Sequence, residues 1–204
     1  MGSHAVPTAV SARDRDVPVA AWRSGLPVLE GQHATLRELR ASDASNLYAA
    51  LTTPEALKFM WAPPPNVVAF ERFIEWTHAE REAGKYICFG MVPRGEEHAW
   101  GVFELRQLQP GFLRGELGFV IAPPYWGKGI FVEAARMLLA FAFDTVKVHR
   151  VEARVSTDNG RGNAAIGKIG FEREGTLRDA FWCEDHFADQ YLWATLASTW
   201  RRAV

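Results

Sequence analysis

The feature that most restricts the fold of this chain is the segment PPYWGKGIFVEAARMLLAFAF, residues 123–143. It places Gly127 and Gly129 directly before a long apolar run, although glycine weakens helices. The first turn of a helix carries unpaired N–H groups and a partial positive charge, and glycine lets an anion approach them. The segment therefore predicts a phosphate-binding turn at the start of a buried helix over Lys128–Val146.

The remaining elements follow from hydrophobic periodicity. Strands are expected at residues 33–40, 85–92, 99–108, 115–121, 149–155 and 190–196, and further helices at 42–51, 68–83 and 163–169. The consecutive strands between residues 85 and 121 are joined by turn-rich links, which favours an antiparallel meander. The later strand–helix–strand unit requires a right-handed crossover and a parallel strand pair. The pattern is that of an α+β fold.

Composition limits the domain organisation and the partners. The chain has 204 residues and is 48% hydrophobic, enough for one domain with a full core. Residues 1–27 lack periodicity and are interpreted as an N-terminal arm, which leaves residues 28–204 as the domain. Lys and Arg number 23 against 24 Asp and Glu, so the net charge of −1 gives no reason to expect nucleic acid.

The cysteines and the hydropathy pattern bear on location. Cys88 and Cys183 are too few for a disulfide framework and lack metal-ligand spacing, which fits a reducing cytoplasm. No apolar run reaches the ~18 residues that a membrane span needs. We therefore expect a cytoplasmic protein that does not bind membranes.

A second phrase, HRVEARVSTDNGRGNAAIGKIGFEREG at residues 149–175, combines a strand, an asparagine loop and a short helix. Together with the glycine turn it resembles motifs A and B of the GNAT superfamily of acyl-CoA N-acyltransferases, most of all the RimJ/RimL-type ribosomal-protein N-acetyltransferase branch. The resemblance is dense over residues 115–175. The matching positions are Glu116, Tyr125–Gly129, Glu133–Ala134, His149–Val155, Asp158–Asn159, Gly170–Phe171 and Glu174–Gly175.

The resemblance implies a GNAT fold. This is a mixed central sheet of about seven strands flanked by about four helices, with acetyl-CoA wedged where the fourth and fifth strands splay apart. It also implies backbone pairing with the pantetheine arm, a turn that holds the pyrophosphate, and two asparagines beside the short helix. The implied cofactor-binding residues are Phe119, Val120, Ile121, Trp126, Gly127, Lys128, Gly129, Ile130, Phe131, Asn159 and Asn163.

The implied reaction is acetyl transfer from acetyl-CoA to a primary amine, either a protein N-terminus or a small molecule, by direct attack in a ternary complex. Charge then builds on the thioester oxygen, and we expect the N–H of Val120 to stabilise it. Glu116 is the candidate base acting through water, with Glu104 in reserve. Asn159 is expected near the thioester. No metal is needed for this chemistry.

Two positions depart from the family pattern. Gly162 stands where the branch commonly has a serine that protonates the thiolate, and Ile166 stands where other branches have a tyrosine. Water or Tyr125 would then have to supply the proton, and a non-catalytic or weakly catalytic acyl-CoA-binding module remains an alternative. Phe131 replaces the usual Gly or Ala and is tolerable if its ring points into the core.

The resemblance to the family also implies that two loops lie over the path by which the acceptor amine enters the site. Trp61, Trp182 and His186 are the candidate acceptor-binding residues, together with Glu184 and Asp185. A more distant reading is an unrelated nucleotide-phosphate binder that shares only the glycine turn. Homodimerisation is compatible with this branch, but no residue pattern decides it.

Overall fold

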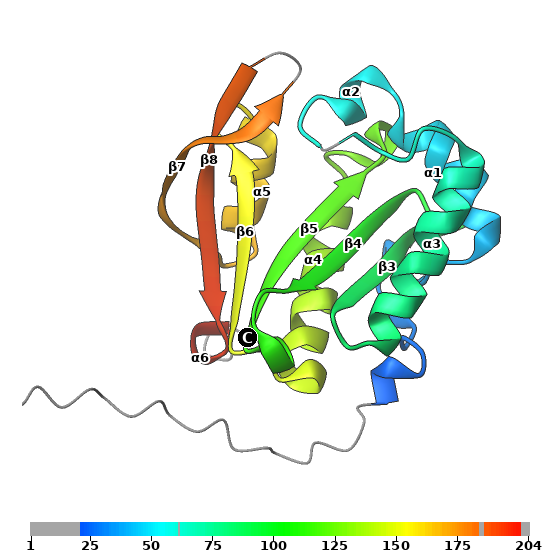
Figure 1. Ribbon diagram of the computed structural model, residues 1–204, viewed down its shortest axis with the longest axis horizontal. Helices are drawn as coiled ribbons and strands as arrows, with labels where there is room; N and C mark the ends of the chain where they lie inside the picture. The colour runs from blue at the N-terminus through cyan, green and yellow to red at the C-terminus, as the bar shows by residue number, and fades with distance from the viewer. Residues whose placement is uncertain (1–20, 61, 184–185, 201–204) are drawn as a thin grey trace, which may run out of the picture.

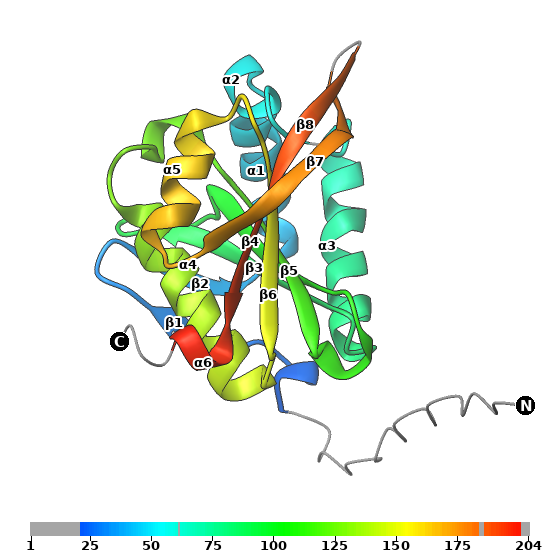
Figure 2. The ribbon, with the colours of Figure 1, turned by 90° about the vertical axis from the view of Figure 1, so that its left-hand side faces the viewer.

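The computed structural model describes residues 21–60, 62–183 and 186–200. The eight strands form one sheet in the order β1-β2-β3-β4-β5-β6-β8-β7, with helices on both faces (Figures 1 and 2). The strands are β1 (Leu29–Glu30), β2 (Ala34–Glu38), β3 (Tyr86–Pro93), β4 (Gly101–Gln107), β5 (Arg114–Ile121), β6 (Arg150–Ser156), β7 (Glu172–Cys183) and β8 (His186–Leu196). The helices are α1 (Ala44–Leu51), α2 (Pro54–Leu57), α3 (Val67–Glu82), α4 (Ile130–Phe141), α5 (Gly160–Lys168) and α6 (Ala197–Trp200).

The sheet separates two apolar cores. On one face α4 packs Leu138 and Leu139 against alternate residues of β3 and β4, such as Phe89 and Phe103. On the other face α1 and α3 pack against the intervening residues, such as Val102. Figure 2 shows α4 and α5 on one side of the sheet and α3 on the other. Each face of β5 therefore borders a different layer of helices.

The strand and helix predictions are largely confirmed, including the antiparallel meander of β3, β4 and β5. The sheet has eight strands rather than about seven. The strand that the pattern missed is β7, whose residues 172–176 are all exposed, so its sequence shows no apolar alternation. It pairs with β8 and is interrupted by irregularities in register. β1 has two residues and is too short to show an alternating pattern.

The predicted splay lies between β5 and β6, which correspond to the fourth and fifth expected strands. Their parallel pairing runs from Arg114 opposite Arg150 to Glu116 opposite Glu152 and then ends. Figure 1 shows the two strands diverging beyond this point. We call the point of divergence the fork. The parallel pair opens towards the start of α4.

The described residues 21–27, inside the range expected to be an arm, include a packed segment. Trp22 lies in a short 3₁₀ helix, is buried, and meets the Phe112 ring edge-on at 5.8 Å between centroids. A single tryptophan without periodic neighbours gives no pattern from which its burial could be read. The rest of the expected arm, residues 1–20, lies outside the described residues.

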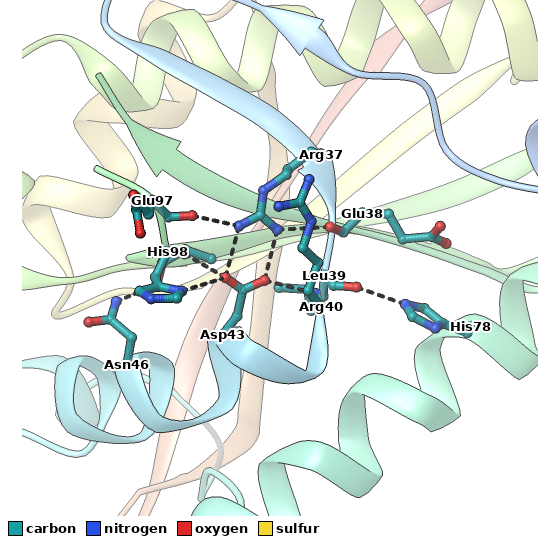
Figure 3. Close-up of polar contacts among 10 residues, drawn as sticks. Arg37, Glu38, Leu39, Arg40, Asp43, Asn46, His78, Glu97 and His98 are labelled. Atoms are coloured by element: carbon teal, nitrogen blue, oxygen red, sulfur yellow. Dashed lines mark hydrogen bonds and ion pairs between the residues drawn. The ribbon is translucent and has the colours of Figure 1, made fainter. Parts of the chain in front are cut away.

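A buried carboxylate fixes the corner between β2 and α1 (Figure 3). Asp43 is fully buried and accepts hydrogen bonds from Arg37 Nη1 and Nη2 at 2.8 and 2.9 Å. It also accepts the backbone N–H groups of Arg40 and Ala99 at 2.8 and 3.0 Å. Burial alone would raise the pKa of Asp43, but these hydrogen bonds outweigh burial and leave the pKa below its ordinary value. The ionised carboxylate therefore ties α1 to the loop before β4.

The buried helix after the glycine turn is shorter than predicted. α4 ends at Phe141, and a turn of π-helix continues the chain from Ala142 to Val146. No helix among the described residues has both the length and the apolar character that crossing a membrane requires.

Candidate active site

The start of α4 has the backbone that the glycine turn predicts. Gly127 and Gly129 have φ angles of +73° and +79°, in the left-handed region that favours glycine. Gly129 is the N-cap residue of α4, and no side chain caps the helix. A Cβ atom at either glycine would meet open space, so glycine is needed here for conformation rather than for room. The free N–H groups of the first turn are thus left available to an anion.

A cavity of about 310 Å³ adjoins this helix start. It is bordered by the end of β5, the glycine turn, α5 and two residues that follow α2. Eight of the predicted cofactor residues line it: Phe119, Val120, Ile121, Trp126, Gly127, Gly129, Phe131 and Asn159. The sequence-based prediction missed Phe59, Met60, Arg161 and Lys168, which also line it.

Three predicted cofactor residues do not line the cavity. The Lys128 side chain is exposed, with its ammonium 5.5 Å from the centre of the Tyr125 ring. Ile130 is buried in the core under α4. Asn163 uses its amide within the protein, because Nδ2 donates to Ser156 O at 2.8 Å and Oδ1 accepts from Trp193 Nε1 at 2.9 Å. Asn163 thus fixes α5 to the sheet.

The register of β5 against β4 determines the direction in which the backbone N–H group of Val120 points. Hydrogen-bonded pairs alternate along an antiparallel ladder. Ala122 N–H donates to Trp100 O at 2.8 Å, and two residues earlier Val120 stands opposite Val102. The same alternation directs the N–H of Val120 towards β4. This register does not support Val120 as the donor to the thioester oxygen.

The neighbours of Val120 face the fork. By the same alternation, the backbone groups of Phe119 and Ile121 point towards β6, where the parallel pairing has already ended. Ile121 O accepts Trp126 Nε1 at 2.6 Å, which fixes the indole against the strand. Phe119 and Ile121 therefore remain in position for amide pairing with an extended ligand.

The Phe131 ring points into the core and packs against other aromatic rings. Its ring lies 4.5 Å from that of Phe119 and 5.9 Å from that of Phe103, measured between centroids. The three aromatic rings form an apolar wall under the cavity. The bulky residue at this motif position thus packs into the core instead of into the turn.

The short helix α5 begins with Asn159, whose Oδ1 accepts Gly162 N–H at 2.9 Å. A Cβ atom at Gly162 would lie 2.7 Å from Asn159 Nδ2 and 2.8 Å from its Cγ. Glycine is therefore required while Asn159 keeps this cap. The Asn159 amide therefore crowds the position that the Cβ of any larger residue at 162 would take. Ile166 is fully buried and offers no polar group.

The two candidate bases differ in their partners. Glu116 accepts Arg106 Nη2 and, at 3.1 Å, Arg154 Nη1, so it joins β4 and β6 across the start of the fork. Glu104 is half-buried and accepts the Tyr86 hydroxyl. Both carboxylates lie on the face of the sheet that carries α1 and α3.

Glu104 extends over the neighbouring strand. A Cβ atom at Gly118 would collide with the Glu104 carboxylate, so the glycine makes room for it beside Phe119. Burial raises the pKa of Glu104 above its ordinary value, although the Tyr86 hydrogen bond and the Arg106 charge oppose the shift. A carboxylate with a raised pKa is a stronger base than an ordinary one.

Tyr125 lines the cavity with its ring, but its hydroxyl donates to Glu96 Oε1 at 2.9 Å. Burial and the Glu96 carboxylate raise the pKa of Tyr125 to about 12. A phenol with this pKa is a weaker acid than an ordinary tyrosine. The geometry therefore favours water over Tyr125 as the proton source for a leaving thiolate.

The predicted acceptor residues are only partly described. Trp61, Glu184 and Asp185 lie outside the described residues. Trp182 is 50% exposed near the tip of the β7–β8 hairpin, with its ring 4.8 Å from that of Phe187. His186 is exposed on the same hairpin. Within the described residues no three His, Cys, Asp or Glu side chains converge on a possible metal site.

The fold and the site define a class of protein. A parted pair of parallel strands offers backbone groups to an extended amide chain, and the adjoining helix start offers N–H groups to a diphosphate. Coenzyme A carries both parts, so the arrangement is that of an acyl-CoA-dependent transferase. The chain belongs to the GNAT acetyltransferases, because the family model described as "Acetyltransferase (GNAT) domain" matches residues 33–172. It is an N-acetyltransferase, and its cosubstrate is acetyl-CoA.

Relatives with known names refine the placement. An uncharacterized N-acetyltransferase, p20, of Bacillus licheniformis is 25% identical over 172 residues, covering 84% of this chain and 97% of that protein. The ribosomal protein uS5-alanine N-acetyltransferase of Escherichia coli (strain K12) is 27% identical over 118 residues, covering 57% and 61%. Mycobacterium smegmatis RimJ, solved in complex with CoA-disulfide, has a similar fold with a TM-score of 0.74 at 24% identity, covering 81% and 82%. The chain is RimJ/RimL-like, and these relatives do not favour a non-catalytic module.

Proposed function

We propose that the enzyme acetylates the N-terminal amine of a protein, with the thioester of acetyl-CoA held in the fork between β5 and β6. The observation that carries the proposal is the arrangement around β5. The cavity and the glycine turn adjoin its end, and the Glu104 carboxylate lies over Gly118 on the face that carries α1 and α3. Amine and thioester can then meet at the edge of one strand, which accounts for much of the rate by proximity.

In the proposed complex the cofactor is held mainly by backbone. The N–H groups that start α4, in the turn from Trp126 to Phe131, bind the diphosphate. The backbone of Phe119 and Ile121 pairs with the pantetheine amides, and Asn159 borders the acyl end. An N–H in this part of β5 stabilises the oxyanion, and Phe119 takes this role in place of Val120.

Glu104 acts as the general base in this proposal, in preference to Glu116. Glu116 is engaged by two guanidinium groups, which stabilise its charge and occupy its oxygens. Glu104 has a raised pKa, and within the described part of the chain its one hydrogen-bond partner is the Tyr86 hydroxyl. The ammonium form of the acceptor loses a proton to Glu104 through water, and the neutral amine attacks the thioester carbonyl. As the tetrahedral intermediate collapses, its nitrogen loses its second proton to water and the C–S bond breaks, and the CoA thiolate takes a proton from water.

The acceptor class rests on the relatives and on the exposed tip of the β7–β8 hairpin. One relative is named for acetylation of alanine in ribosomal protein uS5, and another, from Escherichia coli (strain K12), is a spermidine N(1)-acetyltransferase. Exposed Trp182, Phe187 and His186 at the β7–β8 tip offer an apolar and polar contact for a peptide. A small-molecule amine is the second candidate. The cytoplasmic location favoured by the two cysteines suits either acceptor.

Thiol release from acetyl-CoA over a matched set of amines tests the acceptor. The set contains a peptide with free N-terminal alanine, the same peptide with a blocked N-terminus and an internal lysine, and spermidine. We expect release above background with the free N-terminus alone. Thiol release only with spermidine would show that the acceptor is a small molecule and not a peptide. If none of the amines caused thiol release although the protein bound CoA, the proposal that it is a catalyst would be contradicted.

A further inference from the structure

Arg161 occupies an unusual place beside the cavity. It lies in the first turn of α5, and its guanidinium carbon is 3.3 Å from the centre of the Trp126 ring. Trp126 directly precedes the glycine turn, and Arg161, Trp126, Gly127 and Gly129 all line the same cavity. The stack therefore connects α5 to the proposed diphosphate site across the open side of the fork.

The stack leaves the cation free for another ligand. A guanidinium that lies flat on an indole uses its face, while its five N–H donors remain in the plane and point outwards. Trp126 is itself fixed by its hydrogen bond to Ile121 O at 2.6 Å. Among the described residues Arg161 forms no ion pair with a carboxylate. The result is a positioned, unneutralised cation at the edge of a site built from N–H groups.

We propose that Arg161, held on the Trp126 ring, binds the diphosphate of acetyl-CoA and selects for phosphorylated cofactors. This inference rests on the proposed cofactor site. Backbone N–H groups alone provide partial charges, whereas a guanidinium supplies a full charge and paired hydrogen bonds to phosphate oxygens. Arg161 would thus supply from α5 the cationic side chain that the turn lacks, since Lys128 points to solvent over Tyr125.

Binding titrations separate this role from a structural one. The ligands are CoA, dephospho-CoA (which lacks the 3′-phosphate) and pantetheine (which lacks all phosphates), followed by amide chemical shifts so that weak binding is also measured. We expect Arg161→Gln to weaken CoA and dephospho-CoA at least about tenfold, as for loss of a charge-assisted hydrogen bond, and to leave pantetheine unchanged. Trp126→Leu should cause a smaller loss that largely disappears in the Arg161→Gln background.

The matched control is Arg173→Gln. Arg173 stacks on the Tyr191 ring at 4.5 Å, so the variant removes the same charge and the same kind of stack away from the cavity. It should leave every affinity unchanged. Equal CoA affinity of Arg161→Gln and wild type, or equal losses for CoA and pantetheine, would overturn the proposal. A loss for CoA but not dephospho-CoA would overturn the assignment to the diphosphate. Absence of CoA binding by the wild-type protein would instead refute the cofactor site.

Discussion

The two faces of β5 border parts of the site that are built in different ways. At the end of the strand, the proposed cofactor region is built mainly from main-chain groups: the glycine turn, the first turn of α4, and the backbone groups of Phe119 and Ile121 that face the fork. On the α1 and α3 face, the region proposed to receive the acceptor amine consists of side chains, in which Tyr86, Glu104 and Glu116 come from three strands. A main-chain site tolerates changes of side chain, whereas a side-chain site depends on each residue and on the register between strands.

This contrast predicts that substitutions in the two regions change different properties of the enzyme. The largest effect is expected at Glu104. Glu104→Gln keeps the shape and removes the base, so kcat should fall by about 10²–10⁴-fold while acetyl-CoA affinity is retained. Because the pKa of Glu104 is raised and only the deprotonated form accepts a proton, the rising limb of the wild-type pH–rate profile should lie above the ordinary range for glutamate.

The control for this prediction is Glu116→Gln, which removes an equal charge from the other candidate base. It should reduce kcat much less and retain the rising limb. Loss of that limb in Glu116→Gln and not in Glu104→Gln would restore Glu116 as the base.

The next largest effect is expected on the stability of the fold, at Asp43, which lies on the α1 and α3 face of the sheet. Asp43→Asn leaves the buried Arg37 charge without its partner, and we expect the free energy of unfolding to fall by about 3 kcal/mol in urea denaturation at neutral pH. The pKa of Asp43 is lowered in the folded state, so its stabilising contribution is present above the unfolded pKa and is lost as pH falls through the folded pKa. The variant should therefore lose less stability than wild type in acid.

The folded Asp43→Asn variant should still bind CoA with wild-type affinity, since Asp43 and its hydrogen-bond partners lie on the other side of the sheet from the glycine turn. As a control, Glu174→Gln breaks the more exposed pair with Arg150 and should cost less than about 1 kcal/mol. Equal losses of stability in the two variants would show that the Asp43 cluster contributes no more to the stability of the fold than an exposed ion pair does.

The cofactor region should respond to charge at Gly129. Gly129→Asp and Gly129→Asn have the same shape, and both residues tolerate a positive φ, so their difference isolates one negative charge at the proposed diphosphate site. We expect Asp to weaken CoA binding at least tenfold relative to Asn, about 1.4 kcal/mol, in calorimetric titrations. Indistinguishable affinities would mean that the phosphates bind elsewhere.

The same contrast explains what could be predicted from the sequence. The glycine turn, α4 and β6 are local patterns, and the antiparallel meander follows from neighbouring strands, so these were found. Which N–H groups of β5 face the fork depends on pairing with β4, and the preference for Glu104 depends on its contacts with Tyr86 and Gly118. Neither relation is encoded in a single segment.

Other features of the site could not be predicted from the sequence for similar reasons. Arg161 lies in a glycine-rich segment that gives its side chain no recognisable role, and only the folded chain brings its guanidinium onto Trp126. Phe59 and Met60 follow α2, far along the chain from the rest of the cavity. Glycine at position 162 is visible in the sequence, but the close approach of the Asn159 side chain to that position is not.

A crystal structure of the protein with CoA tests the central claim most directly. We predict diphosphate oxygens about 3 Å from backbone nitrogens in the turn from Trp126 to Phe131, and the thiol end between β5 and β6 beside Phe119. A diphosphate seated away from the start of α4, with the fork empty, would contradict the account.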